Sequence, residues 1–154
     1  MIPIRTARPD DRDAILSVAE TSGLFAPEEV PFLAETFDGW SPDASDDPRF
    51  WLLSEDGAAA AAVVPQPLSD NAWNLQFLAV ARDRQRGGLG RAMLRAVEAR
   101  LAEVQARLLL IDTASGSEQA AARALYAAEG YAQVGQVPGY YGPGIDRVTF
   151  ARRL

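Results

Sequence analysis

One short segment of the chain gathers glycine residues and positive charge. Residues 83 to 91 read Asp-Arg-Gln-Arg-Gly-Gly-Leu-Gly-Arg, between an apolar stretch at 73–80 and a helical pattern. The first backbone N–H groups of a helix lack intrahelical acceptors, and the helix dipole adds about half a positive charge there. Glycine lets an anion approach the backbone closely. This turn is therefore predicted to bind a phosphate group, most favourably a pyrophosphate; the alternative is that the glycines only form a tight turn.

The spacing differs from that of two common phosphate-binding loops. A Walker A loop ends in Gly-Lys-Ser/Thr, and all 15 basic residues of this chain are arginine. The dinucleotide fingerprint Gly-x-Gly-x-x-Gly is met at Gly88 and Gly90, but Met93 occupies the third glycine position. The arginines at 82, 84, 86 and 91 are expected to raise the electrostatic potential around the turn.

The missing residue types limit the chemistry. The chain of 154 residues contains no cysteine, histidine or lysine. The absence of cysteine excludes a thiolate nucleophile, the absence of histidine removes the commonest general base, and the absence of lysine excludes Schiff-base chemistry on the enzyme. No metal site is expected. The net charge of −6 argues against a nucleic-acid partner. No apolar run approaches the ~20 residues of a membrane span and no secretory signal is visible, so no membrane partner and a cytoplasmic location are expected.

The elements that must position the turn read as one mixed α/β (α+β) domain over residues 1–154. The expected order is β-α-α-β-β-β-α-β-α-β-β. Apolar residues at 94, 97, 101, 104 and 108 recur at helical spacing, and Leu108 belongs either to this face or to the next strand. The expected strands are 2–7, 50–54, 58–64, 73–80, 107–113, 131–137 and 145–154, and the expected helices are 9–23, 27–38, the segment after 90, and 118–129.

Three local features are less regular. Pro31 either lies in the first turn of the helix at 27–38 or splits it. Ser115 and Glu118 have the spacing of a capping box at the start of the last helix. Residues 138–144 are expected to form a turn-rich loop.

The turn fits the pattern Gln/Arg-x-x-Gly-x-Gly/Ala, as Gln85-Arg-Gly-Gly88-Leu-Gly90. With it, the sequence resembles the GNAT family, the Gcn5-related N-acetyltransferases. Three further segments carry the resemblance: Leu78-Ala-Val80, Leu125-Tyr126-Ala-Ala-Glu-Gly130-Tyr131 and Tyr140-Tyr141-Gly-Pro-Gly-Ile-Asp146. Together these motifs span roughly residues 73 to 150. The resemblance implies a single GNAT-like domain with a mixed sheet of six to seven strands flanked by about four helices.

The resemblance also implies acetyl-CoA as co-substrate, without a metal. The pyrophosphate is expected on the backbone amides of residues 86–91, and the pantetheine arm beside the backbone near Leu78 and Val80. Gln119 stands where the family often has asparagine. The implied binding residues are Leu78, Ala79, Val80, Gln85, Arg86, Gly87, Gly88, Leu89, Gly90, Arg91 and Gln119.

Tyr126 matches the family's general acid for the CoA thiolate, with simple packing as the alternative. The general base is open. Many family members carry a glutamate on the strand before the loop, where this chain has Gln76 and no carboxylate. Asp112, Asp146 or a chain of water molecules could serve instead, and Asp112 could equally bond loop amides. Without cysteine, direct attack by the amine in a ternary complex is favoured over a covalent acetyl-enzyme.

The implied function is an acetyl-CoA-dependent N-acetyltransferase for a primary amine, on a small molecule or a protein. The alternatives are a non-catalytic acyl-CoA-binding sensor or interaction module, and a nucleotide-binding regulator. Exposed sheet edges near the C-terminus would also allow a homodimer. The acceptor contacts expected from topology are Trp73, Tyr140, Tyr141 and Asp146, with Phe25, Trp40 and Asp70 as further candidates; the aromatic residues among them could instead be core.

Overall fold

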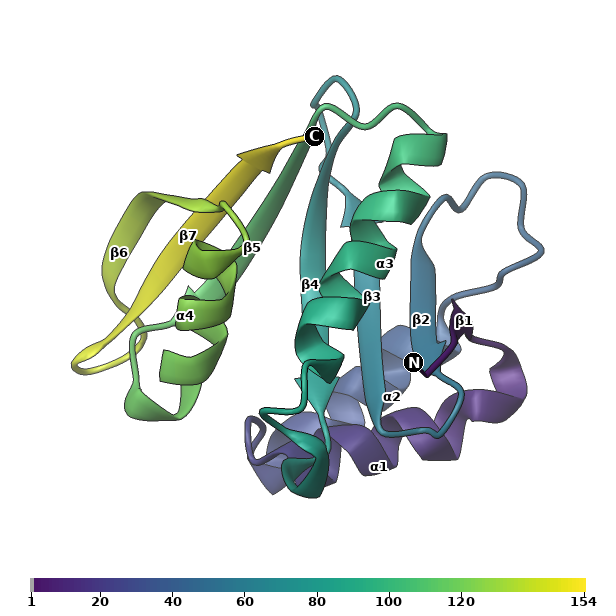
Figure 1. Cartoon of the computed structure of the whole chain (residues 1–154), viewed down its shortest axis with the longest axis horizontal. Helices are drawn as coiled ribbons and strands as arrows, with labels where there is room; N and C mark the ends of the chain where they lie inside the picture. Colours follow the sequence, from purple (N-terminus) through teal and green to yellow (C-terminus); the bar gives the residue numbers. More distant parts are fainter. Residues whose placement is uncertain (1) are drawn as a thin grey trace.

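The computed structural model describes residues 2–154 and contains one sheet of seven strands with the order β1-β2-β3-β4-β5-β7-β6. Neighbouring strands run antiparallel except β4 and β5, which are parallel. Figure 1 shows α1 and α2 on one face and α3 and α4 on the other. The elements are β1 (Ile4–Thr6), α1 (Arg12–Ser22), α2 (Val30–Asp38), β2 (Phe50–Ser54), β3 (Ala59–Pro65), β4 (Ala72–Val80), α3 (Leu89–Glu103), β5 (Leu108–Ala114), α4 (Ala120–Ala128), β6 (Ala132–Gly142) and β7 (Ile145–Arg153).

Two apolar layers hold the sheet between the helix pairs. Alternate residues of a strand face opposite sides, so Leu52 of β2 packs under α3 while Trp51 packs under α1. On α3 the buried residues recur at the spacing of one helix face: Leu89, Met93, Leu94, Val97 and Leu101. The predicted element order, with seven strands and four α-helices in the described residues, is confirmed.

Four local predictions are resolved by tertiary contacts. Pro31 lies in the first turn of α2, so the helix is not split. Val104 ends α3 and is 50 % exposed, and Leu108 starts β5. The capping box at 115–118 is wrong, because the Ser115 hydroxyl instead accepts the Asp146 N–H at 2.8 Å. The predicted loop at 138–144 is also wrong, since β6 continues to Gly142.

The extension of β6 depends on pairing that sequence patterns do not reveal. β7 pairs with β6 from Ala132 to Gly142, with irregularities that absorb extra residues between Gln133 and Gly135 and between Val137 and Gly142. Such bulges let a strand pass through glycine and proline without leaving the sheet. Among residues 2–154, no helix has the length and apolar character of a membrane span.

Candidate functional site

The glycine–arginine segment forms a turn with an unusual backbone between β4 and α3. Arg86 and Gly88 both adopt positive φ, at 66° and 86°. Gly88 is the N-cap of α3. A side chain built on Gly88 would meet no atom within 4 Å, so the space above this backbone is open. Successive residues of this kind turn their N–H groups toward one concavity, which suits an anion.

The amides of this turn have no backbone acceptor of their own. The first α3 amide that donates is that of Ala92, to the Gly88 carbonyl at 3.0 Å. Within the described chain, no backbone hydrogen bond uses the N–H groups of residues 86 to 91. Together with the positive end of the α3 dipole, they offer donors to a bound phosphate.

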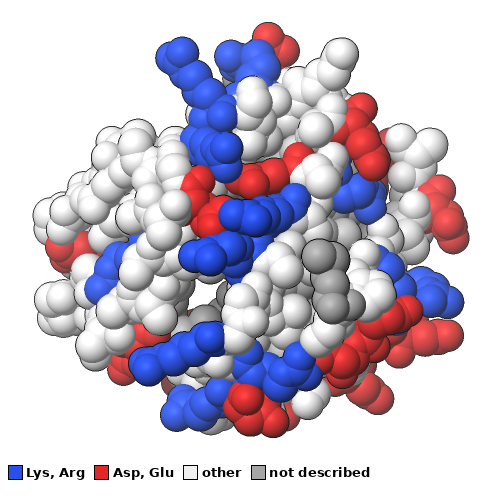
Figure 2. All heavy atoms as spheres, in the orientation of Figure 1, with Lys and Arg blue, Asp and Glu red and all other residues white. Residues whose placement is uncertain are grey.

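The four neighbouring arginines are not equivalent. Arg84 is paired with Asp56, and Arg91 with Glu129 at 2.5 Å. Arg82 lies in the space that a side chain on Gly23 would need. In the part of the chain that the structure describes, neither Arg82 nor Arg86 has an ion pair. The local positive charge is therefore smaller than the sequence suggests, and Figure 2 shows the arginine side chains of this end, at the lower edge, interleaved with acidic ones.

Gln85 links the turn to the ends of β4 and α1. Its side-chain amide donates to the carbonyl of Val80, at the end of β4, and to that of Ser22, at the end of α1, both at 2.9 Å. The amide is thus engaged with the protein itself. We infer that Gln85 positions the turn; the ligand contact that the sequence suggested stays a prediction.

Replacing Gln85 with alanine removes both hydrogen bonds, and each neutral hydrogen bond contributes about 1 kcal/mol to the stability of the folded turn. We expect the Kd for CoA to rise about tenfold, because the turn must then be ordered on binding. The kcat at saturating acetyl-CoA should change little. Calorimetry and steady-state kinetics measure the two effects. A loss confined to kcat would contradict the positioning role.

Strand β4 separates from β5 halfway along its length. The parallel pairing ends at Leu75 and Ile111. At the same level β4 carries a bulge, because Ala62 of β3 pairs with Phe77 and Val63 pairs with Leu75, which leaves Gln76 without a partner. A bulge bends and twists its strand. Figure 2 shows a hollow on the face of the molecule that carries α3 and α4, between these two helices.

The backbone of β4 past the bulge faces this opening. The Ala81 N–H donates to Ala58 of the β3 side at 2.8 Å. Strand backbone groups alternate in direction, so the N–H and C=O groups of Leu78 and the N–H group of Val80 point toward the opening, while the Val80 carbonyl accepts the Gln85 amide. The side chain of Leu89 is buried, so only its backbone could contact a ligand. The side chain of Ala79 is also buried, and its backbone groups face Ala60 of β3. A row of strand donors and acceptors thus leads from the turn into the opening.

Tyr126 lies on α4, next to this opening. A side chain on Gly90 would touch Leu125 at 3.4 Å and Val80 at 3.7 Å, so the start of α3 packs directly on α4 and β4. The Tyr126 side chain is 5 % exposed and packs against the rings of Tyr131 and Phe150. Burial raises the pKa of Tyr126 to about 12. The hydroxyl therefore keeps its proton at neutral pH.

Asp112 occupies the opposite face of the sheet, one residue past the last paired position of β5 with β4. The Thr149 hydroxyl donates to its Oδ1 at 2.6 Å, and the Asn74 amide donates to its Oδ2 at 3.4 Å across the start of the opening. Arg147 Nε lies 3.9 Å from Oδ1. Helix α1 packs on β3 and β4, and α2 packs against α1 and, through Phe37, against Trp51 of β2. Neither helix covers Asp112, and its carboxylate stays exposed.

Tyr140 and Tyr141 flank this carboxylate from the β6–β7 hairpin. The two rings form an edge-to-face pair at 4.9 Å, and the Arg147 guanidinium stacks on Tyr140 at 4.6 Å. Partial burial, followed by the negative charge of Asp112, raises the pKa of Tyr141. Both rings are about half exposed, at 55 % and 49 %.

Two sequence candidates for the acceptor site are otherwise engaged. Trp73 is buried under α3 against Phe50 and donates to Asn71, so it does not line an acceptor site. Asp146 accepts the Gly139 N–H at 2.9 Å and the Gln136 amide at 2.7 Å, and these bonds, the Gly139 bond first, lower its pKa. A carboxylate tied into the hairpin and poorly basic is a weak candidate for a general base.

The remaining candidates are peripheral. Gln119 precedes α4, with its backbone N–H bonded to Gly116. Asp70 lies at the other end of β4, beside Arg107, and Trp40 is buried. Sequence reasoning missed Asn74, Thr149 and Arg147, because only the strand register brings them to Asp112.

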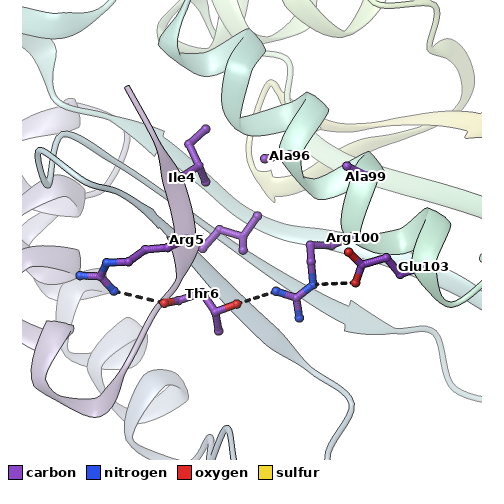
Figure 3. A pocket seen from close by; sticks show the side chains of 8 residues that line it. Ile4, Arg5, Thr6, Ala96, Ala99, Arg100 and Glu103 are labelled. Carbon is purple, nitrogen blue, oxygen red and sulfur yellow. Dashed lines mark hydrogen bonds and ion pairs between the residues drawn. The ribbon is translucent and has the colours of Figure 1, made fainter. Parts of the chain in front are cut away.

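Two hollows lie outside this arrangement. One, of about 370 Å³, separates β1 from the second half of α3, where Arg100 bonds the Thr6 hydroxyl at 2.5 Å and pairs with Glu103 at 3.7 Å (Figure 3). It is remote from the turn at the start of α3. The other, of about 420 Å³, lies between the ends of α1 and α2 and is lined by Glu20, Phe25, Pro27, Val30 and Pro31.

Comparison with known proteins agrees with this geometry. The family model described as the acetyltransferase (GNAT) family matches residues 15–131. The chain belongs to the GNAT family. A GNAT-family structure from Desulfovibrio desulfuricans is 26 % identical, with a TM-score of 0.91 and 99 % of each chain covered. A search of curated protein sequences gave no match.

Two further GNAT-like structures share the fold at lower identity. The ribosomal-protein-S18-alanine N-acetyltransferase of Escherichia coli is 23 % identical, with a TM-score of 0.75, covering 99 % of this chain and 94 % of that one. The yncA protein of Salmonella typhimurium, solved with its cofactor acetyl-CoA, is 17 % identical, with a TM-score of 0.77, covering 100 % and 94 %.

Proposed function

We propose that this chain is one acetyl-CoA-dependent N-acetyltransferase domain acting on a primary amine. The observation that carries the proposal is the continuity between the unpaired amides at 86–91 and the β4 backbone at Leu78 and Val80, which leads into the opening between β4 and β5. A diphosphate fits the first part and an extended amide-containing arm fits the second. The acetyl-CoA bound by the Salmonella structure supports the same assignment.

Tyr126 and Asp112 lie on opposite faces of the sheet, and we assign them the two proton transfers of the reaction. Tyr126, buried and protonated, would donate its proton to the departing CoA sulfur. Asp112, exposed on the other face, would accept the proton of the attacking amine. An ammonium group first loses one proton to water. The neutral amine then forms the amide C–N bond as the thioester C–S bond breaks, and it loses one further proton while the thiolate gains one. Without cysteine in the chain, no acetyl–cysteine stage is available.

A binding assay and a transfer assay test the proposal together. Calorimetry should detect CoA and acetyl-CoA binding, and a panel of primary amines should release free CoA thiol above the buffer rate. Tight CoA binding without release on any amine would favour the alternative, a non-catalytic acyl-CoA module. The observation that favours this alternative is Gln76, whose amide stands where many family members carry a catalytic carboxylate. Binding of ATP or NAD in preference to CoA would overturn both.

Replacing Asp112 with asparagine tests the proposed base. The amide keeps the size of the side chain and can still contact Thr149 and Asn74, but it cannot take a proton. We expect kcat/KM to fall by about 100-fold, as for loss of general base catalysis, and the acidic limb of the pH–rate profile to disappear. An intact acidic limb in the variant would leave Asp112 with a structural role only.

A further inference from the structure

Arg147 lies on the open face beside Asp112 and is only loosely paired with it. Its Nε is fully buried and has no hydrogen-bond partner in residues 2–154. Its one carboxylate neighbour, Asp112, lies at 3.9 Å, which is too long for a hydrogen bond. Arg49 and Arg152, by contrast, hold carboxylates at 2.6 and 2.9 Å. Arg147 thus retains its capacity for an anionic partner.

The guanidinium is nevertheless fixed in place. It stacks on the Tyr140 ring at 4.6 Å, and its side chain is 33 % exposed. Because Nε is buried, a two-pronged contact with a carboxylate would use the two terminal Nη groups, which stacking leaves free at the edge of the guanidinium plane. The tyrosine therefore orients Arg147 without neutralising it.

Asp112 and Arg147 present opposite charges side by side. Thr149 orients the Asp112 carboxylate from the neighbouring strand at 2.6 Å. A molecule that satisfies both must carry a positive and a negative group at a similarly short separation. An α-amino acid has this arrangement, because one carbon joins its amino and carboxylate groups. A peptide N-terminus or a simple amine offers the ammonium group but no adjacent carboxylate.

We propose that the acceptor is a free α-amino acid, with its amino group at Asp112 and its carboxylate at Arg147. This inference rests on the proposed acetyl transfer and specifies its substrate class. Arg147 is then a specificity-determining residue, while Asp112 and Tyr126 carry the proton transfers. The acetylated product would keep the carboxylate and lose the positive charge, so the contact with Asp112 would weaken after transfer.

The test compares the twenty protein α-amino acids with their α-carboxamides and with the corresponding decarboxylated amines. We expect thiol release with at least one amino acid, at a kcat/KM about 10- to 100-fold above that of its amide, the range for a charge-assisted hydrogen bond. Arg147→Gln should remove most of this preference by raising KM for the amino acid about 10- to 100-fold, while kcat/KM with the amide falls much less. Arg153→Gln, an equal charge change at the exposed end of β7, is the control.

The outcomes separate the two proposals. Transfer to amides or plain amines at rates equal to those of amino acids, unaltered in Arg147→Gln, would overturn the amino-acid assignment and leave acetyl transfer standing. Absence of release from every compound, with CoA bound, would overturn acetyl transfer and with it the acceptor class. Thermal unfolding and CoA affinity should match the parent in both variants, and a second readout is calorimetric binding of the amino acid to the CoA complex.

Discussion

Replacing Tyr126 with phenylalanine is expected to lower kcat by about 100-fold or more, the usual contribution of a positioned general acid, while the Kd for CoA stays the same. The phenyl ring keeps its packing against Tyr131 and Phe150, so folding is preserved. Only the hydroxyl is lost, and no hydrogen bond of the described residues uses it. Because burial raises the pKa of Tyr126 to about 12, the parent hydroxyl is protonated throughout the neutral pH range and able to donate.

Tyr131 provides the matched control. It is five residues away and also buried, but its hydroxyl donates to Glu98 at 2.7 Å, which is a structural bond. Tyr131→Phe should lower the free energy of unfolding by about 2 kcal/mol, because the bond goes to a carboxylate, and leave kcat unchanged. Stopped-flow or steady-state thiol release measures kcat in both variants. A Tyr126→Phe enzyme with parental kcat would remove Tyr126 from the chemistry and reduce it to a packing residue.

The architecture was accessible from sequence because it depends on local patterns. The helix face at Leu94, Val97 and Leu101 is set by a spacing of three and four residues, and Gly23 ends α1 in the left-handed conformation that glycine favours. The turn at 83–91 was visible for the same reason, since its glycines and the following helix are contiguous. The extent of β6 was missed because strand pairing with β7 overrides its glycine and proline content.

The site itself depends on register, which the sequence does not state. Asp112 and Tyr126 lie on opposite faces of the sheet, and Asp112 meets Thr149 only because these two residues are directly opposed in β5 and β7. The bulge at Gln76 likewise arises from a mismatch between two strands. The positive charge around the turn at 83–91 was overestimated for a related reason. Arg84 and Arg91 pair with Asp56 and Glu129, which are distant from them in the sequence.

Gly88→Asp is expected to weaken CoA binding by about 100-fold or more, since placing like charges together costs several kcal/mol and 1.4 kcal/mol is a factor of about ten. The structure leaves open space where the new side chain would project, so no clash with the protein accompanies the change. The positive φ of 86° at Gly88 adds a strain of about 1–2 kcal/mol to the folded state. Affinity must therefore be measured on folded protein, by calorimetry well below the unfolding temperature.

Gly144→Asp separates strain and net charge from the loss of the anion site. Gly144 also has a positive φ, 77°, and a side chain added there would likewise meet no atom within 4 Å, but it lies in the turn between β6 and β7. Both variants should lose similar stability, since both force an aspartate into the left-handed region. Only Gly88→Asp should lose CoA, because only there does the carboxylate meet the amides at 86–91. Equal CoA affinity in the two variants would mean that the diphosphate is bound elsewhere, and the proposed reaction would lose its structural basis.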